Sequence, residues 1–148
     1  MKKDPPTAIR ILLVDDNVLG STARGMILKE HGYDVEAALN AGEAWETFQK
    51  NHFDIVVTDF RMHGMSGLEL IRRIREAGSP ARIILLSGFL NGLGMTEEST
   101  GADELITKSN KEVVELLRAV KKLSVRPRRR SPGSQGPGPR SSKKANAG

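Results

Sequence analysis

The sequence predicts an α/β domain in which a parallel sheet is covered by helices on both sides. Short apolar runs alternate along the chain with segments whose apolar residues recur at helical spacing. Strands joined through helices form right-handed crossovers, which place the helices on both faces of a parallel sheet. The runs are almost wholly apolar instead of alternating with polar residues, which is typical of strands buried on both faces.

The first half of the domain is expected to contain two strands and two helices. Residues 9–14 form the first strand and residues 33–39 the second. Between them a helix is predicted from the apolar positions Leu19, Ala23, Met26 and Ile27. After the second strand, Ala41, Ala44, Trp45 and Phe48 have the i, i+3, i+4, i+7 spacing of one helix face, and the two aromatic residues are interpreted as core residues.

The second half repeats this alternation. Strands are expected at residues 53–58, 83–86 and 104–107. One helix is predicted from Leu68, Ile71 and Ile74, and a last one from Val113, Leu116, Leu117 and Val120. Between residues 88 and 101 the pattern is weak, so a helix in that segment would be short and loosely defined.

The chain divides into a domain over residues 1–123 and a basic tail over residues 124–148. The tail has seven basic residues, no acidic residue and many Pro, Gly and Ser residues, so it is expected to be disordered. Subtracting these seven charges from the net charge of +5 leaves residues 1–123 at −2. The domain itself is therefore mildly acidic.

Composition excludes several classes of protein. The chain has no cysteine, which excludes a disulfide framework and a thiolate metal site. No apolar run approaches the ~20 residues of a membrane helix, and the start, MKKDPP, has no apolar segment behind its lysines, unlike a signal peptide. A cytoplasmic protein without a membrane span is expected.

Chemically reactive side chains follow four of the five predicted strands. The first strand ends in Asp15-Asp16, the third in Asp59, the fourth in Ser87 and the fifth in Lys108. In an open parallel sheet the functional edge lies at the carboxyl ends of the strands. If the strand order is 2-1-3-4-5, the first and third strands are neighbours and the three carboxylates converge.

Three converging carboxylates repel one another unless a cation compensates them. Oxygen ligands without His or Cys favour Mg²⁺. With Lys108 and Ser87 reaching in from the other side, the site suits a tetrahedral dianion such as phosphate. The alternative is purely structural, because Asp16 or Asn17 could serve only as the N-cap of the next helix.

The segments ILLVDDN, VVTDFRMHGMSGLEL, IILLSG and ITKS together resemble the receiver domain of two-component response regulators, over residues 8–122. The resemblance implies a doubly wound, flavodoxin-like α/β fold with a five-stranded parallel sheet of order 2-1-3-4-5. It also implies that Asp59 accepts a phosphoryl group from a phosphohistidine.

The other implied roles concern the surroundings of Asp59. Asp15 and Asp16 would hold Mg²⁺ together with Asp59 and the backbone carbonyl of Arg61. Lys108 and Ser87 would contact the phosphoryl group, which agrees with the importance of positioning and charge neutralisation in phosphoryl transfer.

Two departures from the family pattern lie close to the site. His63 stands where the family usually has proline; it is expected to be a solvent-facing loop residue, or else to tune phosphate lifetime through its charge. Ser109 stands where the family usually has proline after a cis peptide. Because a cis bond before a non-proline residue costs ~2.5–4 kcal/mol, the Lys108–Ser109 bond is either strained cis or relaxed trans.

A third departure is Leu105, which stands where receivers usually have an aromatic switch residue, three positions before the lysine. We expect altered conformational coupling with the phosphorylation chemistry intact, unless Phe89 substitutes for the missing ring. Gly88 is expected to leave the mouth of the site open to a phosphodonor or phosphatase.

We expect a stand-alone signalling module of the chemotaxis or phosphorelay type. Its partners would be a sensor histidine kinase or phosphotransfer protein and a downstream protein target. It would not be an enzyme, since it would catalyse only its own phosphorylation and dephosphorylation. The alternative is a phosphorylation-regulated polyanion binder that contacts nucleic acid or an anionic surface through its basic tail.

Overall fold

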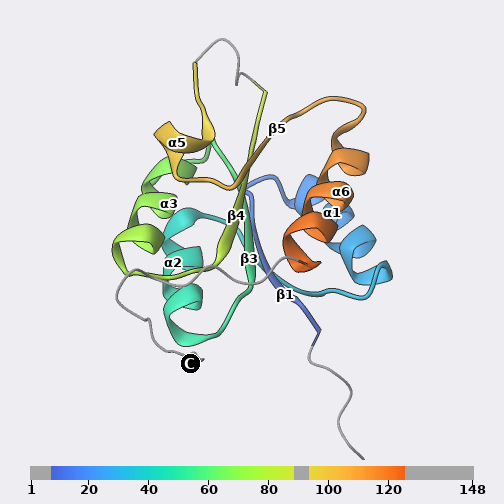
Figure 1. The fold of residues 1–148 in the computed structure, drawn as a ribbon, viewed down its shortest axis with the longest axis horizontal. Coiled ribbons are helices and arrows are strands. Elements are labelled where there is room, and N and C mark those ends of the chain that lie inside the picture. Colours follow the sequence, from blue (N-terminus) through green and yellow to red (C-terminus); the bar gives the residue numbers. More distant parts are fainter. Residues whose placement is uncertain (1–7, 89–93, 126–148) are drawn as a thin grey trace, which may run out of the picture.

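Five parallel strands form one sheet of order β2-β1-β3-β4-β5 in the computed structural model, which describes residues 8–88 and 94–125. The elements follow one another as β1 (Arg10–Val14), α1 (Val18–Glu30), β2 (Asp34–Ala38), α2 (Ala41–Lys50), β3 (Ile55–Asp59), α3 (Gly67–Glu76), β4 (Arg82–Ser87), α5 (Glu97–Thr100), β5 (Glu104–Thr107) and α6 (Glu112–Val125). Helices α2, α3 and α5 lie on one side of the sheet, and α1 and α6 lie on the other (Figure 1). This confirms the predicted fold class and strand order.

The register of the central strands determines which side chains meet at the functional edge. β1 lies between β2 and β3, and Val14 is paired with Thr58. The next residues, Asp15 directly after β1 and Asp59 at the end of β3, therefore lie side by side at this edge. Thr58 is in turn paired with Leu85 of β4, which brings Ser87 to the same edge.

The core consists of two apolar clusters, one on each face of the sheet. Val56, Ile83 and Leu85 face α2 and α3, whereas Ile55, Val57 and Ile84 face α1 and α6. The strands β1, β3 and β4 are almost completely buried along their length, which explains why they are apolar at every position. Trp45 and Phe48 of α2 pack, partly buried, against the first cluster, as predicted.

The predicted buried face of α1 is wrong. Leu19 and Met26 are 82% and 58% exposed, and the residues of this helix that face the sheet are Ser21, Gly25 and Leu28. A Cβ added at Gly25 would lie 3.8 Å from Leu13, so the helix approaches β1 closely through its small residues. The bulky apolar residues of α1 are consequently left on the outer surface.

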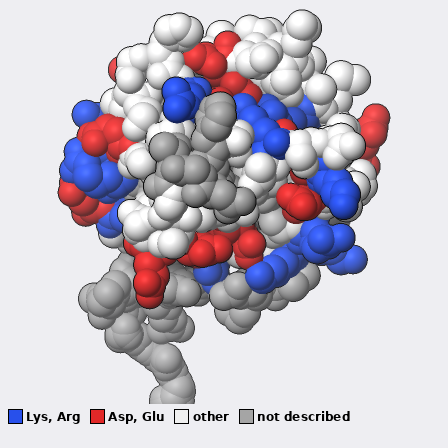
Figure 2. All heavy atoms as spheres, turned by 90° about the horizontal axis from the view of Figure 1, so that it is seen from above, with Lys and Arg blue, Asp and Glu red and all other residues white. Residues whose placement is uncertain are grey.

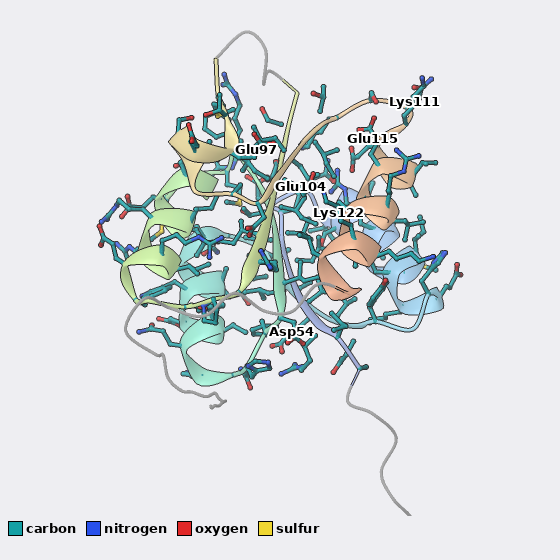
Figure 3. The ribbon with its side chains drawn as sticks, in the orientation of Figure 1. Asp54, Glu97, Glu104, Lys111, Glu115 and Lys122 are labelled. Atoms are coloured by element: carbon teal, nitrogen blue, oxygen red, sulfur yellow. The ribbon has the colours of Figure 1, made fainter. Side chains whose placement is uncertain are left out.

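The last helix, α6, extends to Val125, two residues beyond the predicted end of the domain. It is held to β5 by the ion pair between Lys122 and Glu104, whose Nζ and Oε2 atoms are 2.6 Å apart (Figure 3). The predicted disordered tail lies, from residue 126 on, outside the described residues. Throughout residues 8–88 and 94–125, every helix is too short or too polar to cross a bilayer.

Candidate functional site

The three acidic residues predicted from the strand ends come together at one edge of the sheet. Asp15 and Asp59 are 2% and 6% exposed, and Asp16 is partly exposed. One carboxylate oxygen from each of the three residues lies within 4.8 Å of the others. Figure 2 looks down on this end of the molecule, where acidic and basic side chains are interspersed over the surface.

Helix capping does not explain the two consecutive aspartates. The N-cap of α1 is Asn17, whose side chain accepts a hydrogen bond from the amide of Gly20 at 3.0 Å. Asp15 instead accepts a hydrogen bond from the amide of Asn17 at 2.9 Å, which fixes the orientation of its carboxylate. Both aspartates thus remain at the site while Asn17 performs the structural task.

Lys108 completes the cluster from the far side. Its Nζ lies 2.6 Å from Oδ1 of Asp59, although Lys108 directly follows β5 and β4 lies between β5 and β3. The described residues contain no cis peptide bond, so the Lys108–Ser109 bond is trans. The trans bond therefore still allows the lysine to reach the carboxylate.

The environment of Asp59 disfavours its charged form. Burial raises the pKa of this carboxyl above its usual value, and the nearby carboxylate of Asp15 acts in the same direction. The hydrogen bond and charge of Lys108 oppose the shift without cancelling it. A buried carboxylate that a single ammonium compensates incompletely is a suitable ligand for an additional cation.

Ser87 lies at the end of β4 and is 2% exposed. The amide of Lys108 donates to its backbone carbonyl at 3.0 Å, which ties the ends of β4 and β5 together. A Cβ at Gly88 would meet no heavy atom within 4 Å, so there is free space beside the residue that follows Ser87. Phe89, the suggested substitute for an aromatic switch residue, lies outside the described residues.

The loop after β3 folds back over the site because of Gly67, a residue that sequence reasoning missed. Its amide donates to the carbonyl of Phe60 at 3.0 Å. A Cβ at this position would lie 2.2 Å from the backbone oxygen of Asp59. Only glycine fits here, and the turn places Arg61 and His63 in the lining of a pocket of about 530 Å³ beside Asp16.

His63 faces solvent, as expected, and it also contacts the acidic cluster. Its backbone amide and its Nδ1 lie 3.1 and 2.9 Å from Oδ2 of Asp16. The hydrogen bonds from His63 hold the pKa of the Asp16 carboxyl below its usual value. This contact joins residues 47 positions apart, so no local pattern indicated it.

Arg24 is a second cation at the site that sequence reasoning missed. Its Nη1 lies 2.6 Å from Oδ2 of Asp15, and its Nε donates to the carboxylate of Glu112 at the start of α6. The side chains of Arg24 and Glu112 are 11% and 12% exposed. The two residues are 88 positions apart, so no local spacing could have indicated the pair.

Leu105 packs, partly buried, against the core on the α3 side, and it is paired with Leu85 in the sheet. The position three residues before the lysine thus contributes an aliphatic side chain to the core. The predicted change in conformational coupling remains a prediction.

Comparison with known proteins gives a consistent result. The family described as "Response regulator receiver domain" matches residues 11–121. The chain is 34% identical over 119 residues to the transcriptional regulatory protein TrcR of Mycobacterium tuberculosis, covering 78% of this chain and 46% of that protein. It is 31% identical over 121 residues to a gliding motility regulatory protein of Myxococcus xanthus, covering 78% of this chain and 15% of that protein. The chain thus spans less than half the length of these relatives.

Solved structures agree in fold. The chemotaxis response regulator CheY4 of Vibrio cholerae superposes with a TM-score of 0.71 at 26% identity, covering 79% of this chain and 99% of CheY4. The response regulator protein TrrA of Thermotoga maritima, determined in complex with Mg(2+)-BeF, has a TM-score of 0.65 at 37% identity, covering 78% and 98% of the two chains.

Proposed function

The chain belongs to the response regulator receiver domain family, and we propose that it is a phosphoacceptor switch of a two-component phosphorelay. It accepts a phosphoryl group on Asp59 from a histidine kinase or a phosphotransfer protein. The observation that carries this proposal is the convergence of three carboxylates with the ammonium of Lys108 at the carboxyl ends of the strands. The remaining residues of the site follow from the requirements of that reaction.

In the proposed reaction, a carboxylate oxygen of Asp59 attacks the phosphorus atom of a phosphohistidine. The new P–O bond forms as the P–N bond breaks, and the imidazole nitrogen leaves and takes up a proton. The product on this chain is an acyl phosphate. Hydrolysis of that acyl phosphate by water returns Asp59 to its carboxylate form and releases inorganic phosphate.

A divalent cation fits the site by its donor set. The oxygens of Asp15, Asp16 and Asp59 are hard ligands, and they lie within 4.8 Å of one another with their charges incompletely compensated. We assign Mg²⁺ to these residues together with the backbone carbonyl of Arg61. When bound, Mg²⁺ supplies positive charge that offsets the oxygen charges of the phosphoryl group. The Mg(2+)-BeF complex of TrrA supports this assignment.

The other side chains position and neutralise the phosphoryl group. Lys108, bonded to Asp59 at 2.6 Å, is close enough to pair with a phosphoryl oxygen once the carboxylate is modified. Ser87, at the end of the neighbouring strand, is assigned to donate a hydrogen bond from its hydroxyl to that group. The open space at Gly88 gives the donor access to the site.

The phosphodonor is expected to dock on the outer face of α1. This helix begins directly after the acidic pair and exposes Val18, Leu19 and Met26 at 55%, 82% and 58%. Val114, in the first turn of α6, is also 58% exposed. An apolar surface beside the acceptor fits a phosphohistidine carried on a partner helix, because apolar side chains provide the contact area of a protein interface.

Transfer from purified histidine kinases, autophosphorylated with labelled ATP, tests the proposed function. The label is expected to move to the wild-type chain with at least one kinase and not to Asp59→Asn. Leu19→Asp is expected to slow the transfer at least tenfold while leaving phosphorylation by phosphoramidate, a donor too small to need docking, within twofold of the wild type. Equal transfer to Asp59→Asn would contradict the acceptor assignment.

A further inference from the structure

Arg24 is more completely enclosed than an ordinary surface cation. Its side chain is 11% exposed, and the two carboxylates that it contacts, those of Asp15 and Glu112, have side chains that are 2% and 12% exposed. The guanidinium uses different donors for the two partners, Nη1 for Asp15 and Nε for Glu112. It therefore connects a residue of the acidic cluster to the first turn of α6.

The contacts of Asp15 show what this connection does to the cluster. Oδ2 accepts from Arg24 at 2.6 Å, and Oδ1 accepts from the amide of Asn17 at 2.9 Å. Both oxygens are thus held in one orientation before any metal ion arrives. The rotational freedom that a metal ligand normally loses on binding is already lost in Asp15.

The charges around Asp15 nearly balance those of a divalent cation. The three clustered carboxylates and Glu112 carry four negative charges, and Lys108 and Arg24 carry two positive charges. The remaining charge of −2 is the charge that one divalent cation neutralises. Within this group Arg24 repels the cation, and Glu112 offsets part of that repulsion because it shares the guanidinium.

We propose that Arg24 is a positioning residue that sets the metal affinity of the acidic cluster, and that Glu112 controls how strongly the charge of Arg24 acts on Asp15. The inference rests on the proposed function, because it concerns the Mg²⁺ assigned there. Because such coupling is reciprocal, metal binding is also expected to change the strength of the ion pair between Arg24 and Glu112 of α6. This route from the site to α6 passes through α1 and does not involve Leu105.

Two single variants are expected to change Mg²⁺ affinity in opposite directions. Arg24→Met removes the repelling charge at similar volume, while the amide of Asn17 still orients the Asp15 carboxylate, so binding is expected to tighten on the order of tenfold. Glu112→Gln leaves the full charge of Arg24 to act on Asp15 and weakens binding, roughly threefold or more. A purely structural ion pair predicts that both variants lose stability while their Mg²⁺ dissociation constants stay equal to that of the wild type.

The measurement is a Mg²⁺ titration followed by amide NMR of the full chain, with the amides of residues 59 and 60 reporting the site. The amides of residues 112–114 report the link to α6: they are expected to shift with Mg²⁺ in the wild type and to stay in place in Arg24→Met. Lys29→Met is the matched control, because it removes an exposed positive charge from the same helix. Its dissociation constant is expected to stay within twofold of the wild type.

The double variant tests whether Glu112 acts through Arg24. The account predicts that Arg24→Met/Glu112→Gln binds Mg²⁺ as tightly as Arg24→Met, because Glu112 has lost the group through which it acts. A double variant that binds Mg²⁺ about threefold more weakly than Arg24→Met would show that the two charges act independently, and it would overturn the proposal. If Arg24→Met fails to fold, an unchanged affinity in folded Glu112→Gln overturns the proposal by itself. A wild-type chain that binds no Mg²⁺ would instead refute the proposed function.

Discussion

The ammonium of Lys108 lies 2.6 Å from the carboxylate of Asp59, although Asp59 ends β3, Lys108 follows β5 and these two strands are not neighbours in the sheet. The lysine side chain reaches past the end of β4 to make this contact. The backbone amide of Lys108 donates a hydrogen bond to the carbonyl of Ser87, so the lysine is also anchored to the end of β4. The pair offsets part of the charge of a carboxylate whose pKa is nevertheless raised by burial.

Because its folded-state pKa is raised, the Asp59 carboxyl binds protons more strongly in the folded protein than in the unfolded chain. Its contribution to stability is therefore greatest at low pH and declines as the pH rises through the raised pKa. At pH 7 the ionised carboxylate destabilises the apo protein. Asp59→Asn is expected to raise the melting temperature by a few degrees at pH 7 without Mg²⁺, and calorimetry checks this.

The same comparison at lower pH provides the control. The difference in melting temperature between Asp59→Asn and the wild type is expected to shrink as the pH falls through the raised pKa of the wild-type carboxyl. A difference that stays constant with pH would show that the ionised state of Asp59 is not the cause.

The sequence predicted the sheet and the acidic cluster because both depend on local signals. The buried strands β1, β3 and β4 are continuous apolar runs, and the reactive residues follow them directly. In a parallel sheet, residues at the carboxyl ends of neighbouring strands lie side by side, so their proximity follows from the strand order alone. The meeting of Asp15 and Asp59 therefore follows once β1 and β3 are taken as neighbours, whereas the contact of Lys108 with Asp59 also needs a side chain long enough to pass the end of β4.

The features that were missed depend on close approach or on distant pairing. The buried face of α1 was mispredicted because Ser21 and Gly25, which are small, allow the helix to lie close to β1, whereas hydrophobic periodicity favours bulky residues. The contacts of Arg24 with Glu112 and of His63 with Asp16 join polar residues far apart in the sequence. No periodic pattern marks such pairs.

Two helical glycines are expected to respond to alanine in opposite ways. A Cβ at Gly67 would lie 2.2 Å from the backbone oxygen of Asp59, so Gly67→Ala must displace the site loop or β3. We expect a loss of about 1–3 kcal/mol in the free energy of unfolding.

Gly25→Ala would make only ordinary contacts of 3.8 and 3.9 Å with Leu13 and Val35. It is expected to gain about 0.5–1 kcal/mol, because alanine is the better helix former. Urea denaturation measures both values, and a similar effect at the two sites would contradict this account of the loop.

His63→Ala is expected to raise the pKa of the Asp16 carboxyl toward its usual value of 3.8, because the side-chain hydrogen bond is the largest cause of its depression. The depressed pKa adds stability above pH 3.8 that is lost as the pH falls through the folded-state pKa. Because the His63 side chain is fully exposed, solvent screening is expected to keep the change in stability small. A carbon-13 NMR titration of the Asp16 carboxyl measures the shift.

The second histidine–aspartate pair is the matched control for that titration. His52 contacts Asp54 at 3.0 Å, just before the start of β3 and thus at the opposite end of the sheet. His52→Ala is expected to leave the titration of Asp16 unchanged. An equal shift of the Asp16 carboxyl in both variants would point to a general change in net charge instead of the direct contact.

The central claim is that Asp59 accepts a phosphoryl group in a reaction that requires the acidic cluster and a divalent cation. Intact mass spectrometry after incubation with phosphoramidate and Mg²⁺ tests it most directly. The wild-type chain is expected to gain the mass of one phosphoryl group, and this gain should be lost in Asp59→Asn and suppressed by a chelator. A gain of the same size in Asp59→Asn, or one that the chelator leaves unchanged, would contradict the account.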